Sequence, residues 1–225
     1  MIVSFEGNKG AGKTSRITDL KEMLTNHGFE SSAPRTIFSD SPIGQSLQDI
    51  FNNAYISFEG LSETCLVIAD LTYIVNQEIK KNNEIYLLDR YLDTTRAIQT
   101  LRLMDDYNMK QHESLGIIDR LQNHLPKPDL TVFLDIPYSE AILRMKKRGT
   151  KFSNPNIEER IGGREEDLSK KEQEMFDRIN CIYRYLTTIE ADRFLHLDAR
   201  EDPHTTNQAI YCTILNEYLR INSGD

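Results

Sequence analysis

Short apolar runs alternate with longer segments of helical periodicity along this chain. The clearest runs cover residues 2–5, 84–88, 130–134 and 193–197. Their nearly continuous hydrophobicity is typical of strands that are buried on both faces of a parallel sheet. A weaker strand is expected within residues 29–38.

Between these runs, apolar side chains recur at the spacing of an amphipathic helix. One stripe comprises Leu61, Cys65, Ile68, Leu71 and Val75, and another comprises Met175, Ile179, Ile182, Leu186 and Ile189. The alternation of strands and helices predicts an α/β fold in which a doubly wound parallel sheet has right-handed crossovers.

The length and charge of the chain limit its organisation and its partners. No Pro/Gly/Ser linker or repeat divides the 225 residues, so we expect a single domain over residues 1–225. A net charge of -8 argues against a nucleic-acid polymer as partner. The chain begins almost directly in a core strand and has no long apolar segment, which favours a cytoplasmic protein that does not bind a membrane.

Cys65, Cys181 and Cys212 are scattered and odd in number. This pattern suggests neither a disulfide framework nor a zinc site. We expect the three side chains to be small buried hydrophobes.

The most informative segment directly follows the first apolar run. Residues 7–14 read Gly-Asn-Lys-Gly-Ala-Gly-Lys-Thr, which fits the phosphate-binding pattern Gly-x-x-x-x-Gly-Lys-Ser/Thr. In such a loop, backbone N–H groups and a helix N-terminus surround a phosphate chain. Lys13 should reach the β and γ phosphates of ATP, and the Thr14 hydroxyl should bind Mg²⁺. The alternative is a glycine-rich turn that binds no ligand. The residues expected to hold the nucleotide are Gly7, Asn8, Lys9, Gly10, Ala11, Gly12, Lys13, Thr14 and Ser15.

Charged residues follow the other apolar runs, where the carboxyl ends of parallel strands bind ligands. Asp89 and Arg90 come after the second run, Asp135 after the third and Asp198 after the fourth. Asp89 is a candidate for holding a Mg²⁺-bound water, and Arg90 for gripping a second phosphate in a fork. An ordinary ion pair is the alternative for Asp89 and Arg90, and a cap or turn role is the alternative for Asp135 and Asp198.

Several motifs together resemble the thymidylate kinase family of P-loop nucleoside-monophosphate kinases. They are Phe5-Glu6-Gly7, Ser41-Pro42-Ile43-Gly44, Asp89-Arg90-Tyr91 with the following residues 94–99, residues 128–135, residues 176–186 and Asp198-Ala199. The resemblance implies the P-loop nucleoside triphosphate hydrolase fold with a mobile lid, and ATP-dependent phosphoryl transfer to a nucleoside monophosphate. It also implies that Arg90 contacts the acceptor phosphate and that Arg144 lies against the adenine of ATP.

The lid is expected at about residues 146–168, a basic and then polar stretch. Family members carry their catalytic arginine either inside the phosphate loop or in the lid. Gly10 occupies the loop position here, so this chain resembles the second type, with Arg160 and Arg164 as its candidates. Taken singly, each of these arginines could equally belong to a solvated surface loop.

The acceptor side departs from the family pattern. Lys9 replaces an acidic residue that faces the sugar, Leu71 replaces an arginine that binds the base edge, and Ile98 replaces a tyrosine. We therefore expect an altered acceptor. A deoxynucleoside kinase and a non-catalytic ATP-binding regulator are the alternatives. Related enzymes form homodimers, and the stripe from Leu61 to Val75 could serve this contact or could be core.

Overall fold

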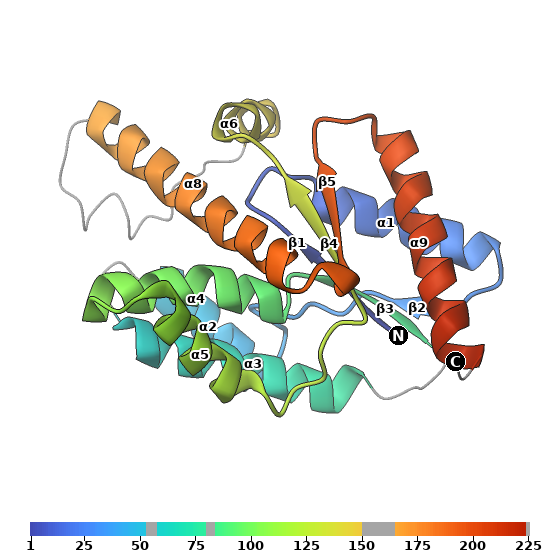
Figure 1. Ribbon diagram of the computed structural model, residues 1–225, viewed down its shortest axis with the longest axis horizontal. Coiled ribbons are helices and arrows are strands. Elements are labelled where there is room, and N and C mark those ends of the chain that lie inside the picture. The colour runs from blue at the N-terminus through green and yellow to red at the C-terminus, as the bar shows by residue number, and fades with distance from the viewer. Residues whose placement is uncertain (53–57, 80–83, 150–164, 224–225) are drawn as a thin grey trace.

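A parallel sheet forms the centre of the molecule (Figure 1). A computed structural model describes residues 1–52, 58–79, 84–149 and 165–223, in which five strands have the order β2-β3-β1-β4-β5. The strands are β1 (Ile2–Glu6), β2 (Ser31–Ser32), β3 (Ile85–Asp89), β4 (Leu130–Asp135) and β5 (Phe194–Asp198). Each predicted run contains a strand, so the predicted α/β fold is confirmed.

Helices cover both faces of this sheet. The described helices are α1 (Lys13–Asn26), α2 (Pro42–Asn52), α3 (Gly60–Glu78), α4 (Leu92–Tyr107), α5 (Gln111–Gln122), α6 (Tyr138–Lys147), α8 (Glu165–Ile189), the short 3-10 helix η1 (Ala191–Arg193) and α9 (Pro203–Ser223). Helices α1 and α9 lie against one face, and α3, α4, α5 and α8 lie on the other side (Figure 1).

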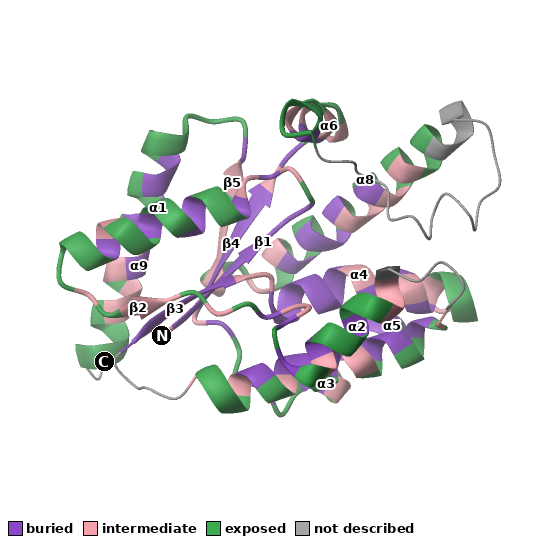
Figure 2. Cartoon of the chain, turned by 180° about the vertical axis from the view of Figure 1, so that it is seen from behind, coloured by how far each residue is buried: buried purple, intermediate pink, exposed green. Residues whose placement is uncertain are grey.

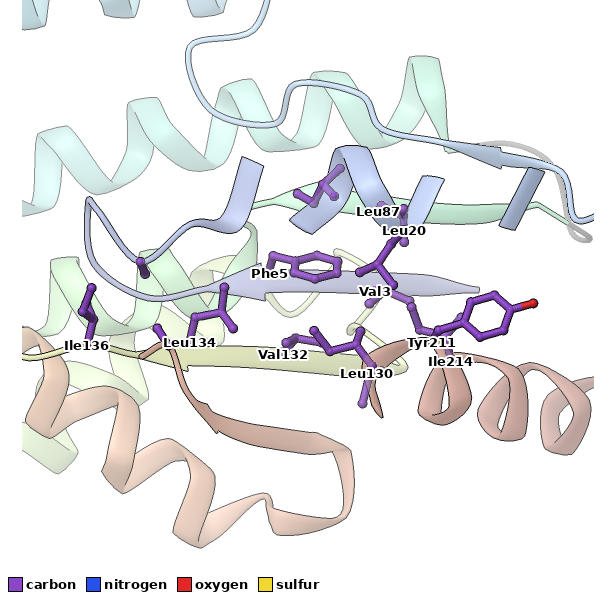
Figure 3. Packing of buried hydrophobic residues seen from close by; sticks show 14 of the residues in the cluster. Val3, Phe5, Leu20, Leu87, Leu130, Val132, Leu134, Ile136, Tyr211 and Ile214 are labelled. Atoms are coloured by element: carbon purple, nitrogen blue, oxygen red, sulfur yellow. The ribbon is translucent and has the colours of Figure 1, made fainter. Parts of the chain in front are cut away.

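Alternate residues of each strand pack on opposite faces, as the two-residue period of a strand requires. Val3 and Phe5 of β1 pack with Leu20 of α1 in the cluster of Figure 3. On β3, Ile85 and Leu87 belong to this same cluster, whereas Tyr86 and Leu88, which alternate with them, join the cluster on the α3 side. The central strands are consequently buried on both faces, whereas the outer sides of the helices are exposed (Figure 2).

The strand register brings the predicted functional segments together. Phe5 of β1 pairs with Asp89 of β3, and Glu6 pairs with Phe133 of β4. Because all the strands are parallel, the loop after β1 and the Arg90 segment after β3 leave the sheet at the same edge. None of the described helices is both long enough and apolar enough to cross a membrane.

The expectation that the cysteines are buried is wrong, because Cys65, Cys181 and Cys212 are all exposed. On α3 the buried face is rotated away from Cys65 and Leu61, and Leu61 is 42% exposed. The polar residues Glu63 and Thr64 point inward instead, since both hydrogen-bond to Gln99 of α4. Leu71 of the same stripe is fully buried, so that end of the stripe is core.

Two glycines provide a matched test of packing around α2. A Cβ on Gly44 would lie 2.4 Å from the backbone N and O of Ser39, whose hydroxyl donates to the buried Asp70 carboxylate. A Cβ on Gly116, in α5, would meet nothing within 4 Å.

We predict that Gly44→Ala lowers the free energy of unfolding by about 1 to 3 kcal/mol, because the Ser39 loop must move. Gly116→Ala should raise it by about 0.5 to 1 kcal/mol. Urea denaturation measures both, and equal stability of the two variants would contradict the packing around Ser39.

Candidate functional site

The loop between β1 and α1 turns through glycines that no other residue could replace without strain. Gly7, Gly10 and Gly12 have φ values of 125°, 89° and 93°. A Cβ on Gly7 would lie 2.4 Å from the carbonyl oxygen of Leu134. Gly12 is the N-cap of α1 and provides no side-chain cap, so the first N–H groups of the helix are available to an anion.

Lys13 extends back into this loop. Its Nζ donates to the carbonyl oxygens of Gly7 at 2.9 Å and Asn8 at 3.2 Å, and the residue is 6% exposed. Burial first and the charge of Arg90 second lower the pKa of Lys13 to about 7, while Asp89 and Glu6 oppose this shift. The loop therefore holds a cation whose direct partners are neutral carbonyls, which suits it to bind phosphate.

Thr14 and Asp89 meet although they are far apart in sequence. The Thr14 hydroxyl donates to Oδ2 of Asp89 at 2.5 Å. A hydroxyl and a carboxylate at the mouth of a phosphate loop are suitable ligands for Mg²⁺, which takes few protein oxygens when phosphates and water supply the others. The Thr14 hydroxyl and the Asp89 carboxylate thus fit the predicted metal.

Arg90 has a strained backbone at the end of β3. Its φ is 72°, a left-handed conformation that costs a residue other than glycine roughly 1 to 3 kcal/mol. Its N–H donates to the Phe5 carbonyl at 3.0 Å, and the Thr36 hydroxyl donates to its carbonyl at 2.5 Å. Its Nη1 donates to the Thr94 hydroxyl at 3.3 Å. These bonds hold the guanidinium beside the phosphate loop.

A buried carboxylate connects these segments. It belongs to Glu6, which the sequence suggested only as part of the motif Phe5-Glu6-Gly7. Glu6 is fully buried and accepts hydrogen bonds from the Tyr91 N–H at 2.8 Å, the Tyr183 hydroxyl at 3.1 Å and the Thr94 hydroxyl. Burial first and the neighbouring Asp93 second raise the pKa of Glu6. The available sequence signal was an acidic residue inside a strand, directly before the glycine loop.

Asn8 connects the same loop to α8. Its side-chain amide donates to the Phe176 carbonyl at 3.0 Å and to Oδ1 of Asn180 at 2.9 Å. Asn180 in turn donates to the carbonyl of Ile136 at 3.0 Å. Both asparagines are buried, so this chain of amides fixes the position of α8 relative to the phosphate loop.

The predicted lid is described only at its two ends, residues 146–149 and 165–168, and Arg144 lies just before it. Arg144 on α6 donates to Glu140 at 2.9 Å and to the Ala199 carbonyl at 3.0 Å, which places it beside the loop that follows β5. Arg160 and Arg164 lie outside the described residues, as does most of the lid.

The remaining strand-end aspartates pair with their neighbours. Asp135 accepts two hydrogen bonds from Arg184, at 2.7 and 3.0 Å, and contacts His196 at 3.1 Å. Asp198 accepts a hydrogen bond from the Arg200 N–H at 2.9 Å, within a turn. Asp198 thus has the turn role that was its alternative, whereas Asp135 forms an ion pair with Arg184 instead of a cap or turn.

The residues that replace the acceptor contacts of the family differ in their environments. Leu71 is fully buried in a cluster that contains Tyr91 and Leu92. Ile98 is half-buried and Lys9 is exposed at the tip of the phosphate loop. Leu71 therefore provides an apolar side chain where a base-binding arginine was expected from the resemblance.

Comparisons with known proteins agree with this geometry. The family model described as Thymidylate kinase matches residues 5–210. A probable thymidylate kinase of Sulfolobus acidocaldarius is 33% identical over 165 residues, which cover 71% of this chain and 75% of that protein. The thymidylate kinase of Mycoplasma capricolum subsp. capricolum is 28% identical over 229 residues, covering 99% of this chain and 97% of that protein.

The lowered pKa of Lys13 predicts a pH dependence of stability. In the unfolded chain this ammonium has a pKa of 10.5, and in the folded protein about 7, so above pH 7 the unfolded state binds more protons. Stability relative to Lys13→Met should then rise from pH 7 to about pH 9, by at most about 1.4 kcal/mol per pH unit. Urea denaturation without nucleotide measures the difference. The control is Lys21→Met on the exposed side of α1, for which the difference should stay flat. A flat difference for Lys13→Met would contradict the buried ammonium.

Proposed function

Because this chain belongs to the thymidylate kinase family of nucleotide kinases, we propose that it transfers the terminal phosphoryl group of ATP to a nucleoside monophosphate. The observation that supports this most directly is the convergence of Lys13, Thr14, Asp89 and Arg90 at one edge of the sheet. Phosphoryl transfer depends mainly on positioning and on charge neutralisation, which such a cluster supplies.

Each of these residues has a role that follows from its contacts. Lys13 exchanges its carbonyl partners for the β and γ phosphates, and the N–H groups at the start of α1 donate to the same phosphates. Thr14 and Asp89 would hold Mg²⁺, directly or through water, and the metal would supply neutralisation of phosphate charge. Arg90, which is near enough to Lys13 for its charge to lower the pKa of that residue, binds the phosphate of the acceptor in a fork.

We further propose that the preferred acceptor is not dTMP. A buried leucine at position 71 cannot donate to a base edge, and Ile98 cannot supply a tyrosine hydroxyl. A substrate group that is left buried and unpaired costs on the order of 1 to 3 kcal/mol. Lys9, which is exposed beside the loop, favours an acceptor with an additional anionic group on its sugar.

A substrate panel tests this proposal. Steady-state kinetics with ATP and Mg²⁺ would compare dTMP, dUMP, dCMP, dGMP, their ribose counterparts and the corresponding nucleosides. We predict a nucleoside diphosphate product, with dTMP neither the best acceptor nor above roughly 10⁴ M⁻¹s⁻¹ in kcat/KM.

Three outcomes of the panel would overturn parts of the proposal. A kcat/KM for dTMP above that value and highest of the panel would restore the thymidylate assignment. Phosphorylation of nucleosides but not of monophosphates would make the protein a deoxynucleoside kinase. ATP binding without turnover on any acceptor would favour a non-catalytic regulator.

A further inference from the structure

Arg16 is a buried cation that has no ion-pair or hydrogen-bond partner among the described residues. It lies on the buried face of α1 and is 4% exposed. Its Nε and Nη2 atoms are buried and make no hydrogen bond to the described part of the chain, and no carboxylate there forms an ion pair with it. Arg96, which is similarly buried, instead pairs with Asp93 and Glu190.

The charged groups near Arg16 compensate its charge only in part. Burial first and the charge of Arg144 second lower the pKa of Arg16, whereas Asp19 and Asp202 raise it. Neither carboxylate forms an ion pair with Arg16: Asp19 accepts from Asn207 at 2.9 Å, and Asp202 accepts from the Thr205 N–H at 2.8 Å and hydroxyl at 2.9 Å. A buried guanidinium that lacks an ion pair and hydrogen bonds is costly, so its presence indicates a ligand that completes its compensation.

The position of Arg16 identifies which part of a ligand it can reach. A Cβ on Gly12 would lie 4.0 Å from its Nη1, so this nitrogen faces the phosphate loop at the start of α1. The charges of Arg90, Asp89 and Glu6 shift the pKa of Lys13. The charges of Arg144, Asp19 and Asp202 shift the pKa of Arg16. The two cations therefore lie toward opposite ends of the loop, Lys13 toward the acceptor and Arg16 toward Arg144.

We propose that Arg16 binds the α-phosphate of the donor nucleotide. This rests on the proposed function, in which the terminal phosphate lies at the Lys13 end and the nucleoside leaves the loop at the Arg144 end. The α-phosphate is then the anionic group nearest to Arg16, and a guanidinium forms strong charge-assisted hydrogen bonds with phosphate oxygens. Arg16 sets the affinity for the donor independently of its base.

Three variants test this role. Arg16→Met keeps a long apolar stem and removes the charge, Arg16→Lys keeps a charge, and Arg220→Met removes an exposed arginine that pairs with Glu217 on α9. Titration calorimetry with Mg²⁺ and ATP, GTP or ADP should show that Arg16→Met lowers the affinity for each nucleotide by roughly 10-fold or more. Arg16→Lys should recover part of that loss, and Arg220→Met should match the wild-type protein.

A second readout separates ligand binding from a structural role. Without nucleotide, Arg16→Met should unfold at higher urea than the wild-type protein, because it removes an unpaired buried charge. ATP should then stabilise it less than it stabilises the wild-type protein.

Unchanged nucleotide affinity would overturn the proposal, as would a loss confined to ATP, which would assign Arg16 to the base. If the wild-type protein binds ATP without transferring phosphate, the proposed function fails while these affinities still decide the role of Arg16. If it does not bind ATP, both fail.

Discussion

The buried carboxylate of Glu6 is the contact on which the arrangement of this site depends. It accepts hydrogen bonds from α4, through Thr94, from α8, through Tyr183, and from the backbone of Tyr91. Because Glu6 directly precedes Gly7, these bonds align the phosphate loop with the segment that carries Asp89 and Arg90. The bond from the Tyr91 N–H to Glu6 adjoins Arg90, whose left-handed backbone also bonds to Phe5 and Thr36. A single buried acid thus couples the proposed donor and acceptor sides.

Around this acid, the site collects positive charge that the protein leaves only partly compensated. Lys13 contacts carbonyl oxygens, Arg16 has no partner among the described residues, and Arg90 contacts a hydroxyl. Elsewhere in the described chain, the buried Arg96 and the half-buried Arg193 are paired with carboxylates. In the proposed function, a polyphosphate would supply the charge that these three residues lack. The arrangement sacrifices stability of the free protein for binding, which is common at functional sites.

The hydrophobic runs were sufficient to predict the strands and their alternation with helices. The glycine pattern was sufficient to place Lys13 and Thr14 between the first strand and the helix that follows it. Contacts between distant polar residues were not predictable, because they depend on partners that the pattern does not name. Glu63 is drawn into the core by Gln99 and Arg102, which turns Cys65 to the surface. Glu6 and Arg16 are polar residues in apolar settings, and their burial follows from tertiary packing.

The most direct test is a crystal structure with Mg²⁺ and a non-hydrolysable ATP analogue. We predict that the triphosphate occupies the loop at residues 7–14, with the Lys13 Nζ moved from the Gly7 carbonyl to the terminal phosphates. The direct bond between Thr14 and Asp89 should open to admit the metal or its water. A nucleotide bound elsewhere, or a loop in which Lys13 keeps both carbonyl partners beside the bound analogue, would contradict this account.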